Sequence, residues 1–197
     1  MAPGNDRVAQ ARPGAGTPVA LLAVGALIPR KGYDVLLAAL AQLADLPWRL
    51  TIVGDLRRDA GTTARVYADI ARYNLADRIL VAGAVSARRL AAFYASAEIF
   101  VLASRFEGYG MAFSEAIAHG VPVVGATAGA IPETAPSGAA LLAPPGDVDA
   151  FAAALRRLIE HPAERRRLAA AAWTAAAALP TWEESATLFS RAIEAVA

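Results

Sequence analysis

The sequence has no cysteine, so it can form no disulfide bond and can offer no thiolate as a nucleophile or metal ligand. An excess of one charge sign is also missing, because 19 basic and 18 acidic residues leave a formal net charge of only +1. That balance gives no electrostatic basis for a nucleic-acid partner. No apolar run approaches the roughly 20 residues of a membrane-spanning helix, and residues 1–18 lack the apolar segment of a signal peptide. We therefore expect a cytoplasmic protein.

Apolar residues are abundant, at 56% of the 197 positions, which is enough for one domain with a sizeable core. Residues 1–17 are rich in glycine, proline and alanine and show no periodicity, so we interpret them as a disordered lead-in or a linker. The other residues, 18–197, are expected to form a single domain.

One stretch combines a strand, a glycine turn, a helix and a second strand. Residues 99–102 form a short apolar run, which predicts a buried parallel strand. Gly108 and Gly110 then allow a tight turn, where backbone can approach a ligand closely. Residues 111–119 are expected to be helical, and residues 121–124 to form the next buried strand. This order places a helix N-terminus at the carboxyl edge of a parallel sheet.

Strands and helices alternate along the rest of the chain without long gaps, which predicts an α/β fold with a Rossmann-like, doubly wound parallel sheet and C-terminal helices. The other expected strands are residues 18–27, 48–54, 78–82 and 139–142. The other expected helices are residues 35–43, 57–73, 86–96, 148–160, 163–178 and 182–196.

Right-handed crossovers bring the loops that follow parallel strands to one edge of the sheet. The loops expected there are residues 25–31, 54–55, 83 and 107–110. Open α/β sheets bind ligands at this edge, and the free N–H groups of a helix N-terminus suit a phosphate. The loops are therefore expected to converge on one ligand.

Two carboxylates bracket the glycine turn, one on the loop before the helix and one about a turn inside it. Glu107 could be a solvated loop residue, and Glu115 could simply complement the helix dipole. Together with the glycines between them, however, the two acids favour a ligand site over packing alone.

Residues 107–115 read Glu-Gly-Tyr-Gly-Met-Ala-Phe-Ser-Glu, which resembles the signature of the retaining family 4 (group 1) glycosyltransferases. Four other segments also resemble the family and occur in the same order as in its members, so that the resemblance covers about residues 19–195. They are residues 24–32, 50–54, 120–124 and 145–147. The resemblance implies the C-terminal, donor-binding half of a GT-B fold.

The resemblance also implies a function. A nucleotide-diphospho-sugar would lie across this domain, and a hexose-type sugar would pass with retention to an acceptor held by an N-terminal domain or a separate chain. Neither a metal nor a cofactor is implied, since the nucleotide sugar is a substrate. The domain alone would bind donor but transfer little.

Site residues follow from matching positions. Lys31 and Glu107 are expected to be catalytic, the lysine by stabilising the leaving diphosphate and the glutamate by lying near the donor sugar. Glu115 would accept hydrogen bonds from the ribose. The full donor-binding set is Gly25, Lys31, Gly108, Tyr109, Gly110, Met111 and Glu115.

The sequence departs from the family at Ala26, where many members carry an arginine; Arg30 is the nearby cation.

Two other functions stay open: a non-catalytic nucleotide-binding module, and a nucleotide-sugar epimerase of the same fold. The acids around the turn favour the transferase over the epimerase.

Several other signals favour structural roles. Asp147 and Asp149 resemble an Asp-x-Asp metal site, but their place at a helix start predicts a cap and a first-turn acid. His119 and His161 are expected at helix ends. Trp residues 173 and 182 are expected to pack helices.

The late helices also carry a set of arginines, for which a solvated face is the first interpretation. A weak contact with an anionic membrane, at the inner face, is the alternative. These arginines are at positions 156, 157, 165, 166 and 167.

Overall fold

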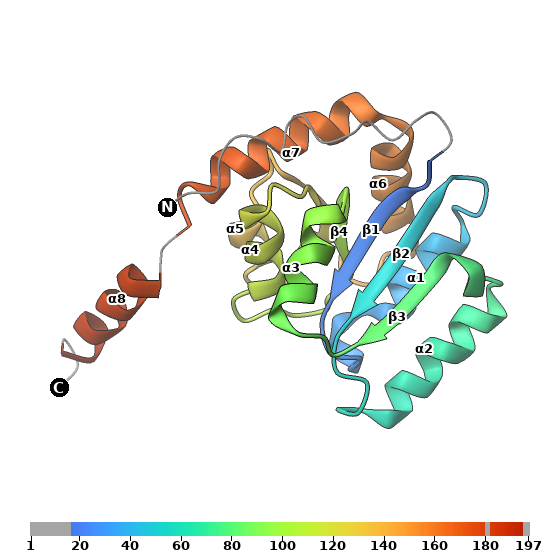
Figure 1. Ribbon diagram of the computed structural model, residues 1–197, viewed down its shortest axis with the longest axis horizontal. Helices are drawn as coiled ribbons and strands as arrows, with labels where there is room; N and C mark the ends of the chain where they lie inside the picture. The colour runs from blue at the N-terminus through green and yellow to red at the C-terminus, as the bar shows by residue number, and fades with distance from the viewer. Residues whose placement is uncertain (1–16, 180–181, 195–197) are drawn as a thin grey trace.

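The computed structural model describes residues 17–179 and 182–194. They form a six-stranded sheet in the order β3-β2-β1-β4-β5-β6, with every neighbouring pair parallel and helices packed around it (Figure 1). The predicted α/β, doubly wound parallel sheet is confirmed. The strands are β1 (Val19–Val24), β2 (Trp48–Val53), β3 (Ile79–Gly83), β4 (Ile99–Leu102), β5 (Val123–Ala126) and β6 (Ala140–Ala143).

Helices connect the strands and complete the C-terminal part of the chain. Two short 3-10 helices are η2 (Pro29–Lys31) and η3 (Ala76–Arg78). The α-helices are α1 (Tyr33–Ala41), α2 (Ala60–Arg72), α3 (Ala87–Ser96), α4 (Met111–Ala118), α5 (Ile131–Thr134), α6 (Val148–Glu160), α7 (Pro162–Ala176) and α8 (Trp182–Glu194).

The order of the strands reverses between β1 and β4. The chain starts in the middle of the sheet, moves outward through β2 to β3, and then returns through α3 to β4 on the other side of β1. The loops that follow β1 and β4 are therefore neighbours at the carboxyl edge. In open α/β sheets this reversal point is where ligands bind.

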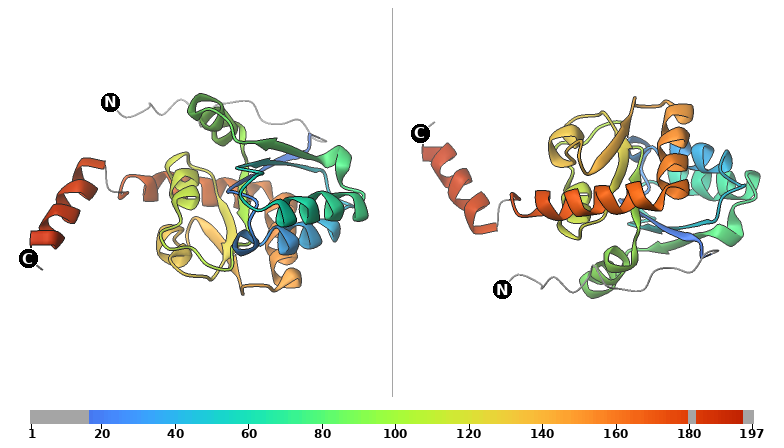
Figure 2. Two further views of the ribbon diagram at one scale, coloured as in Figure 1. Left: turned by 90° about the horizontal axis from the view of Figure 1, so that it is seen from below. Right: turned by 90° about the horizontal axis from the view of Figure 1, so that it is seen from above.

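The core is a two-sided packing of helices on the sheet. All four residues of β4 and of β5 are buried, as expected for central parallel strands covered on both faces. Helix α1 packs against α2 and α6, and α4 packs against α7. Figure 2 shows the same layers from below and above. This packing fixes the strand ends from which the edge loops emerge.

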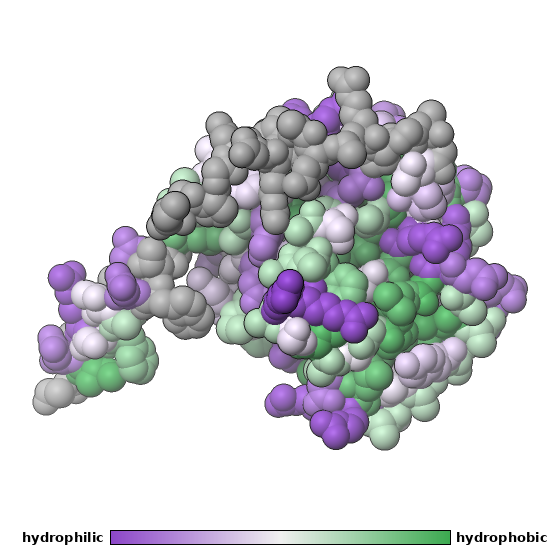
Figure 3. Space-filling model, viewed as in Figure 1, coloured by the Kyte–Doolittle hydropathy of each residue, from purple (hydrophilic) through white to green (hydrophobic). Residues whose placement is uncertain are grey.

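One side of the sheet is less completely covered at its β3 edge. Figure 3 shows apolar side chains gathered over β1 to β3 in the view of Figure 1. Leu80 in the edge strand β3 is 52% exposed, whereas the residues of β4 are buried. The fold thus buries the reversal point far better than the β3 edge.

Several details of the fold differ from the sequence prediction, among them the start of α2 at Ala60 rather than at residue 57. Strand β1 ends at Val24, not residue 27, and residues 29–31 form η2 because proline fixes the backbone for a tight helical turn. Strand β5 begins at Val123 rather than at residue 121. The short helix α5 (Ile131–Thr134) was not predicted, since four residues are too few for helical periodicity.

The predicted cap at Asp147 is confirmed, and Ser86 caps α3 in the same way. Ser86 Oγ accepts the N–H of Arg89 at the start of α3, and Asp147 Oδ1 accepts the N–H of Ala150 at 2.9 Å. Asp149 accepts a hydrogen bond from Gln42 at 2.8 Å. Asp147 therefore caps the N-terminus of α6, and Asp149 joins α6 to the residue that follows α1.

The predicted lead-in, over residues 1–16, lies outside the described residues.

Helix α8 extends away from the sheet (Figures 1 and 2) and leaves Phe189 68% and Ile193 51% exposed. Across residues 17–179 and 182–194, no helix is long and apolar enough to span a bilayer.

Candidate functional site

The loops after β1 and β4 meet at the reversal point of the sheet. The backbone N–H of Arg105 donates to the carbonyl of Arg30 at 2.8 Å, which joins the two loops directly. Gly32 has a φ of 65°, and a Cβ there would lie 2.0 Å from the carbonyl oxygen of Ala103. Only glycine permits both this backbone conformation and this close approach. The contact places η2 beside the loop that carries the first predicted acid.

Glu107 is the centre of the site and is only 5% exposed. Its carboxylate accepts a hydrogen bond from Lys31 Nζ at 2.7 Å, from Ser104 Oγ at 2.6 Å and from Arg30 Nη1 at 3.1 Å. Two of these partners come from the loop after β1, more than 70 positions earlier in the chain. The alternative that Glu107 is a solvated loop residue is therefore wrong.

The partners of Glu107 determine its protonation. Burial alone would raise the pKa of this carboxyl group, but the hydrogen bonds from Lys31, Ser104 and Arg30 outweigh burial and hold the pKa below its ordinary value. Glu107 is therefore an anion at neutral pH. It can bind hydroxyl groups or stabilise positive charge, but it holds no proton to donate as a general acid.

Lys31 is held just as firmly, with a side chain that is 12% exposed. Its aliphatic part packs against Gly25, where an added Cβ would lie 3.1 Å from Lys31 Cε. The hydroxyl of Tyr33 donates to the carbonyl of Gly25 at 2.6 Å and fixes the same loop. Burial, and then the charge of Glu107, raise the pKa of Tyr33, so this hydroxyl stays a donor. Lys31 is therefore no ordinary surface lysine.

The glycine turn leads directly into α4. Gly110 has a φ of 83° and occupies the N-cap position without a side-chain cap. The first N–H groups of a helix have no partner within the helix, so those of Met111 and Ala112 remain free of intrahelical bonds. Tyr109 and Met111 are 57% and 60% exposed. The turn therefore offers backbone donors beside an open surface.

A third loop also supports the turn, and the sequence pattern does not predict this loop. The N–H of Ala130 donates to the carbonyl of Glu107 at 2.9 Å, and Thr134 Oγ1 donates to the carbonyl of Tyr109 at 2.6 Å. Gly129 has a φ of 57°, and a Cβ there would lie 2.1 Å from the carbonyl oxygen of Glu107. The loop between β5 and α5 thus fixes the backbone of the turn.

Glu115 lies on α4, partly buried, in a separate environment from the Lys31–Glu107 pair. Burial, and then the charge and hydrogen bonding of Glu115, raise the pKa of Tyr94. The hydroxyl of Tyr94 donates to the carbonyl of Ala112 at 3.2 Å, and its ring stacks on His119 at 5.1 Å. Among the described residues no contact joins Glu115 to Lys31 or Glu107.

The remaining edge loops also pack together. The N–H of Gly54 donates to the carbonyl of Gly83 at 3.0 Å, and a Cβ on Gly54 would lie 1.9 Å from the carbonyl oxygen of Gly25. The predicted convergence of the loops at one edge is confirmed. Within the part of the chain that the structure describes, no group of three or more His, Cys, Asp or Glu residues could hold a metal ion.

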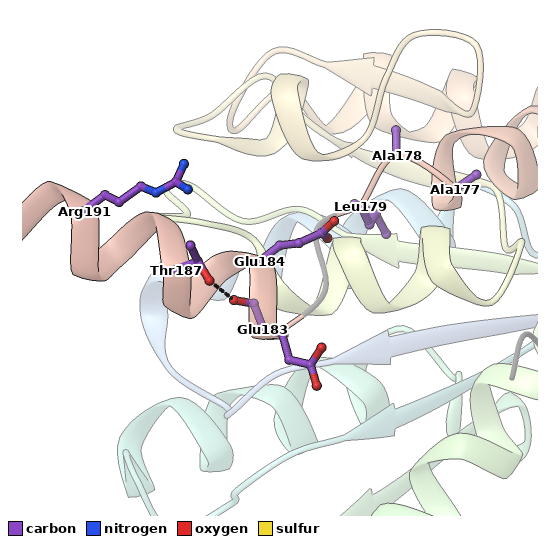
Figure 4. Close-up of a pocket in the computed structure, with 7 residues that line it drawn as sticks. All are labelled: Ala177, Ala178, Leu179, Glu183, Glu184, Thr187 and Arg191. Atoms are coloured by element: carbon purple, nitrogen blue, oxygen red, sulfur yellow. Dashed lines mark hydrogen bonds between the residues drawn. The ribbon is translucent and has the colours of Figure 1, made fainter.

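An open hollow of about 560 Å³ lies elsewhere, between the end of α7 and α8 (Figure 4). Its charged lining consists of Glu183, Glu184 and Arg191. The hydroxyl of Thr187 donates a hydrogen bond to the carbonyl of Glu183 at 2.9 Å. None of the predicted site residues lines it. We place the site at the sheet edge because that location combines a buried ion pair, helix N–H groups and rigid backbone.

Comparison with known proteins shows the family of this chain. A protein-family model described as "Glycosyl transferases group 1" matches residues 7–174. The chain belongs to the group 1 glycosyltransferases. A curated relative, the MMP alpha-(1->4)-mannosyltransferase of Mycolicibacterium hassiacum, is 34% identical over 177 residues, which cover 86% of this chain and 42% of the relative.

Solved structures of glycosyltransferases with the GT-B fold are similar too. Sucrose-phosphate synthase from Thermosynechococcus elongatus has a TM-score of 0.82 and 32% identity, over 99% of this chain and 50% of that one. The Anabaena protein HepE in complex with UDP and glucose has a TM-score of 0.75 and 26% identity, over 83% of this chain and 44% of that one. This group 1 glycosyltransferase chain thus spans half or less of the length of these relatives.

The arginines of the late helices are mostly paired. Arg156 bonds Asp45 at 2.9 Å, Arg157 bonds Glu164 at 2.6 Å, and Arg165 bonds Glu98 at 3.1 Å. A membrane contact of this surface stays a prediction. His161 ends α6 as expected, and the side chain of Trp182 lies outside the described residues.

Proposed function

We propose that this chain is the donor-binding domain of a retaining, metal-independent glycosyltransferase. The donor is a nucleotide-diphospho-sugar, and a hexose-type sugar is transferred. The observation that carries the proposal is the buried pair of Lys31 and Glu107 beside the N-terminus of α4, at the reversal point of the sheet. Packing alone does not favour a cation, an anion and free helix N–H groups in one place.

Each part of the site has a role in this proposal. Lys31 contacts the diphosphate and stabilises the charge that develops on it as the glycosidic bond breaks. The N–H groups of the turn and the first turn of α4, from Gly108 to Met111, bind phosphate or sugar oxygens. Glu115 accepts hydrogen bonds from the ribose, which suits a carboxylate on a rigid helix. Gly25 leaves space for the side chain of Lys31 beneath the donor.

The environment of Glu107 favours one route for retention. A carboxylate that accepts three hydrogen bonds, two of them from cations, is a poor nucleophile because its electron pairs are already engaged. Two-step retention by a covalent intermediate would need a free carboxylate. We therefore favour displacement on the same face of the sugar, in which the leaving phosphate assists the acceptor and Glu107 stabilises positive charge on the sugar.

The acceptor is held by protein that this chain does not contain, either an N-terminal domain or a separate chain. Support comes from length, because the chain covers 42% of the mannosyltransferase and 50% of the sucrose-phosphate synthase. The names of these relatives, and UDP and glucose in the HepE structure, support a hexose donor. Alone, the chain is expected to bind donor and to transfer little.

Calorimetric titration tests the proposal. The chain is titrated with UDP, GDP, ADP and the matching nucleotide hexoses, and the titrations are repeated on Lys31→Gln and Glu115→Gln. We expect saturable binding of one diphosphate that both changes weaken. The absence of binding to any of them would contradict the proposal. Addition of the acceptor-binding half then separates transfer from mere binding, and a released epimer of the nucleotide sugar would indicate an epimerase instead.

A further inference from the structure

The cluster around Glu107 contains more positive charge than its carboxylate needs. Arg30 and Lys31 both bond Glu107, at 3.1 and 2.7 Å, so two cations share one anion. Arg105, a cation on the neighbouring loop, is matched by Asp34 at 2.6 Å and therefore adds no excess charge. The site thus has one positive charge in excess, at the edge where a helix N-terminus already favours anions.

The two cations differ in exposure and in how many of their N–H donors already form hydrogen bonds. Lys31 is 12% exposed and directs its ammonium group at Glu107. Arg30 is 47% exposed and uses only Nη1, which donates to Glu107 Oε2 at 3.1 Å and to the carbonyl of Phe106 at 2.8 Å. Within the described residues, Nη2 and Nε of Arg30 donate no hydrogen bond. A guanidinium has five N–H donors, so Arg30 can keep Glu107 and still bind an anion.

We propose that Arg30 is the second diphosphate contact of this site and binds the donor's phosphates through Nη2 and Nε while Nη1 stays on Glu107. This inference rests on the proposed function and adds a specificity residue to it. A fork of parallel N–H groups matches phosphate oxygens in a way that a lysine cannot. Arg30 thereby makes the site selective for a diphosphate over a monophosphate.

The backbone of Arg30 is rigid enough for this role. Its carbonyl accepts the N–H of Arg105, and the Arg105 guanidinium also donates to the carbonyl of Pro29 at 2.7 Å. Gly32 in the left-handed region ends η2 and leaves Arg30 in the last turn. The side chain is 47% exposed, whereas these hydrogen bonds fix the backbone from which it extends. The guanidinium can therefore adjust to a ligand with little loss of conformational entropy.

The test compares Arg30→Gln, Arg30→Lys and the control Arg57→Gln in titrations with UDP, GDP and ADP and the matching monophosphates. Arg57 is a matched cation, because it lies on the edge loop after β2 and its side chain is 96% exposed. We expect Arg30→Gln to weaken diphosphate binding about tenfold, the value of one charge-assisted contact. Monophosphate binding and Arg57→Gln should change less than about twofold, and Arg30→Lys should lie between.

The outcomes are distinct. Diphosphate affinity that is unchanged in Arg30→Gln but lost in Lys31→Gln overturns the role of Arg30 and leaves the proposed function intact. Equal weakening by Arg30→Gln and Arg57→Gln also overturns it, because the effect is then general charge. No diphosphate binding by the unmodified chain overturns both. Thermal melting of each variant confirms that it is folded.

Discussion

Lys31 Nζ lies 2.7 Å from Oε1 of Glu107, although the two residues are 76 positions apart in the chain. The side chains are 12% and 7% exposed, so the pair is almost fully buried at the sheet edge. A buried ion pair is weak evidence for stability in itself, because desolvation offsets most of the attraction. Its position between a glycine loop and a helix N-terminus is instead the basis of the proposed role in binding a charged donor.

Removal of Lys31 from the ion pair should lower the free energy of unfolding. In Lys31→Gln the Glu107 charge keeps Arg30 and Ser104, so we expect a loss of about 2 kcal/mol in the free energy of unfolding, below the roughly 3–5 kcal/mol of a fully stranded charge. Urea unfolding measures this loss. Arg72→Gln is the control, since Arg72 is 64% exposed, bonds Asp69 at 3.0 Å on the helix surface and should cost less than about 0.5 kcal/mol. Equal costs would contradict the burial argument.

The pair should also give stability a defined dependence on pH. The pKa of Glu107 is lower in the folded state than its ordinary value of 4.5. Its contribution is therefore complete above that ordinary value and is lost as pH falls through the lower, folded value. We expect the stability difference between the unmodified chain and Glu107→Gln to shrink as the solution is acidified below 4.5. A difference that grows on acidification would show that the pKa is raised.

Ser104 should act through Glu107. Its hydroxyl, fully buried, donates to the carboxylate at 2.6 Å. Ser104→Ala removes a hydrogen bond to a charged group and should cost about 2 kcal/mol. It should also bring the pKa of Glu107 closer to its ordinary value, which carboxyl-selective NMR titration can follow. Unchanged titration of Glu107 in Ser104→Ala would show that the serine only fills space.

The junction of the two loops should depend on one glycine. In Gly32→Ala the Cβ would meet the Ala103 carbonyl at 2.0 Å with φ at 65°. We expect a loss of more than about 4 kcal/mol, or a failure to fold. Gly146→Ala is the matched control, with φ at 82° and nothing within 4 Å, and should cost only about 1–2 kcal/mol. Similar costs in thermal unfolding would mean that backbone strain alone explains Gly32.

Glu107 and the donor should compete for Lys31. Glu107→Gln frees the ammonium group of Lys31 and removes a negative charge, so we expect a nucleoside diphosphate to bind about threefold tighter. The matching nucleotide sugar should gain less, because the variant also loses the proposed contact to the sugar. Calorimetry on both ligands gives the ratio. Weaker binding of the diphosphate by Glu107→Gln would instead make the carboxylate a support for Lys31.

Much of the scaffold could be predicted from the sequence. The strand Ile99–Leu102 and the start of α4 at Met111 are where the apolar run and the glycines indicated. The reason is that buried parallel strands and glycine stops leave local patterns. The convergence of loops at one edge then followed from the handedness of the crossovers.

The contacts within the site could not be predicted in the same way. The bonds of Glu107 to Lys31 and Ser104, and the support from Gly129, depend on side-chain conformations and on loops that meet only in the folded chain. Gly129 lies in a segment whose four-residue helix has no periodicity. Ser104 is a common residue type, and nothing in its spacing distinguishes a buried hydrogen-bond donor from a surface serine.

The most direct test of the donor site is a crystal structure of this chain soaked with the diphosphate that binds best. We predict phosphate oxygens within hydrogen-bond distance of Lys31 Nζ and of the first N–H groups of α4, with the ribose on Glu115. A nucleotide bound in the hollow between α7 and α8, or at the sheet edge without contact to Lys31, would contradict it.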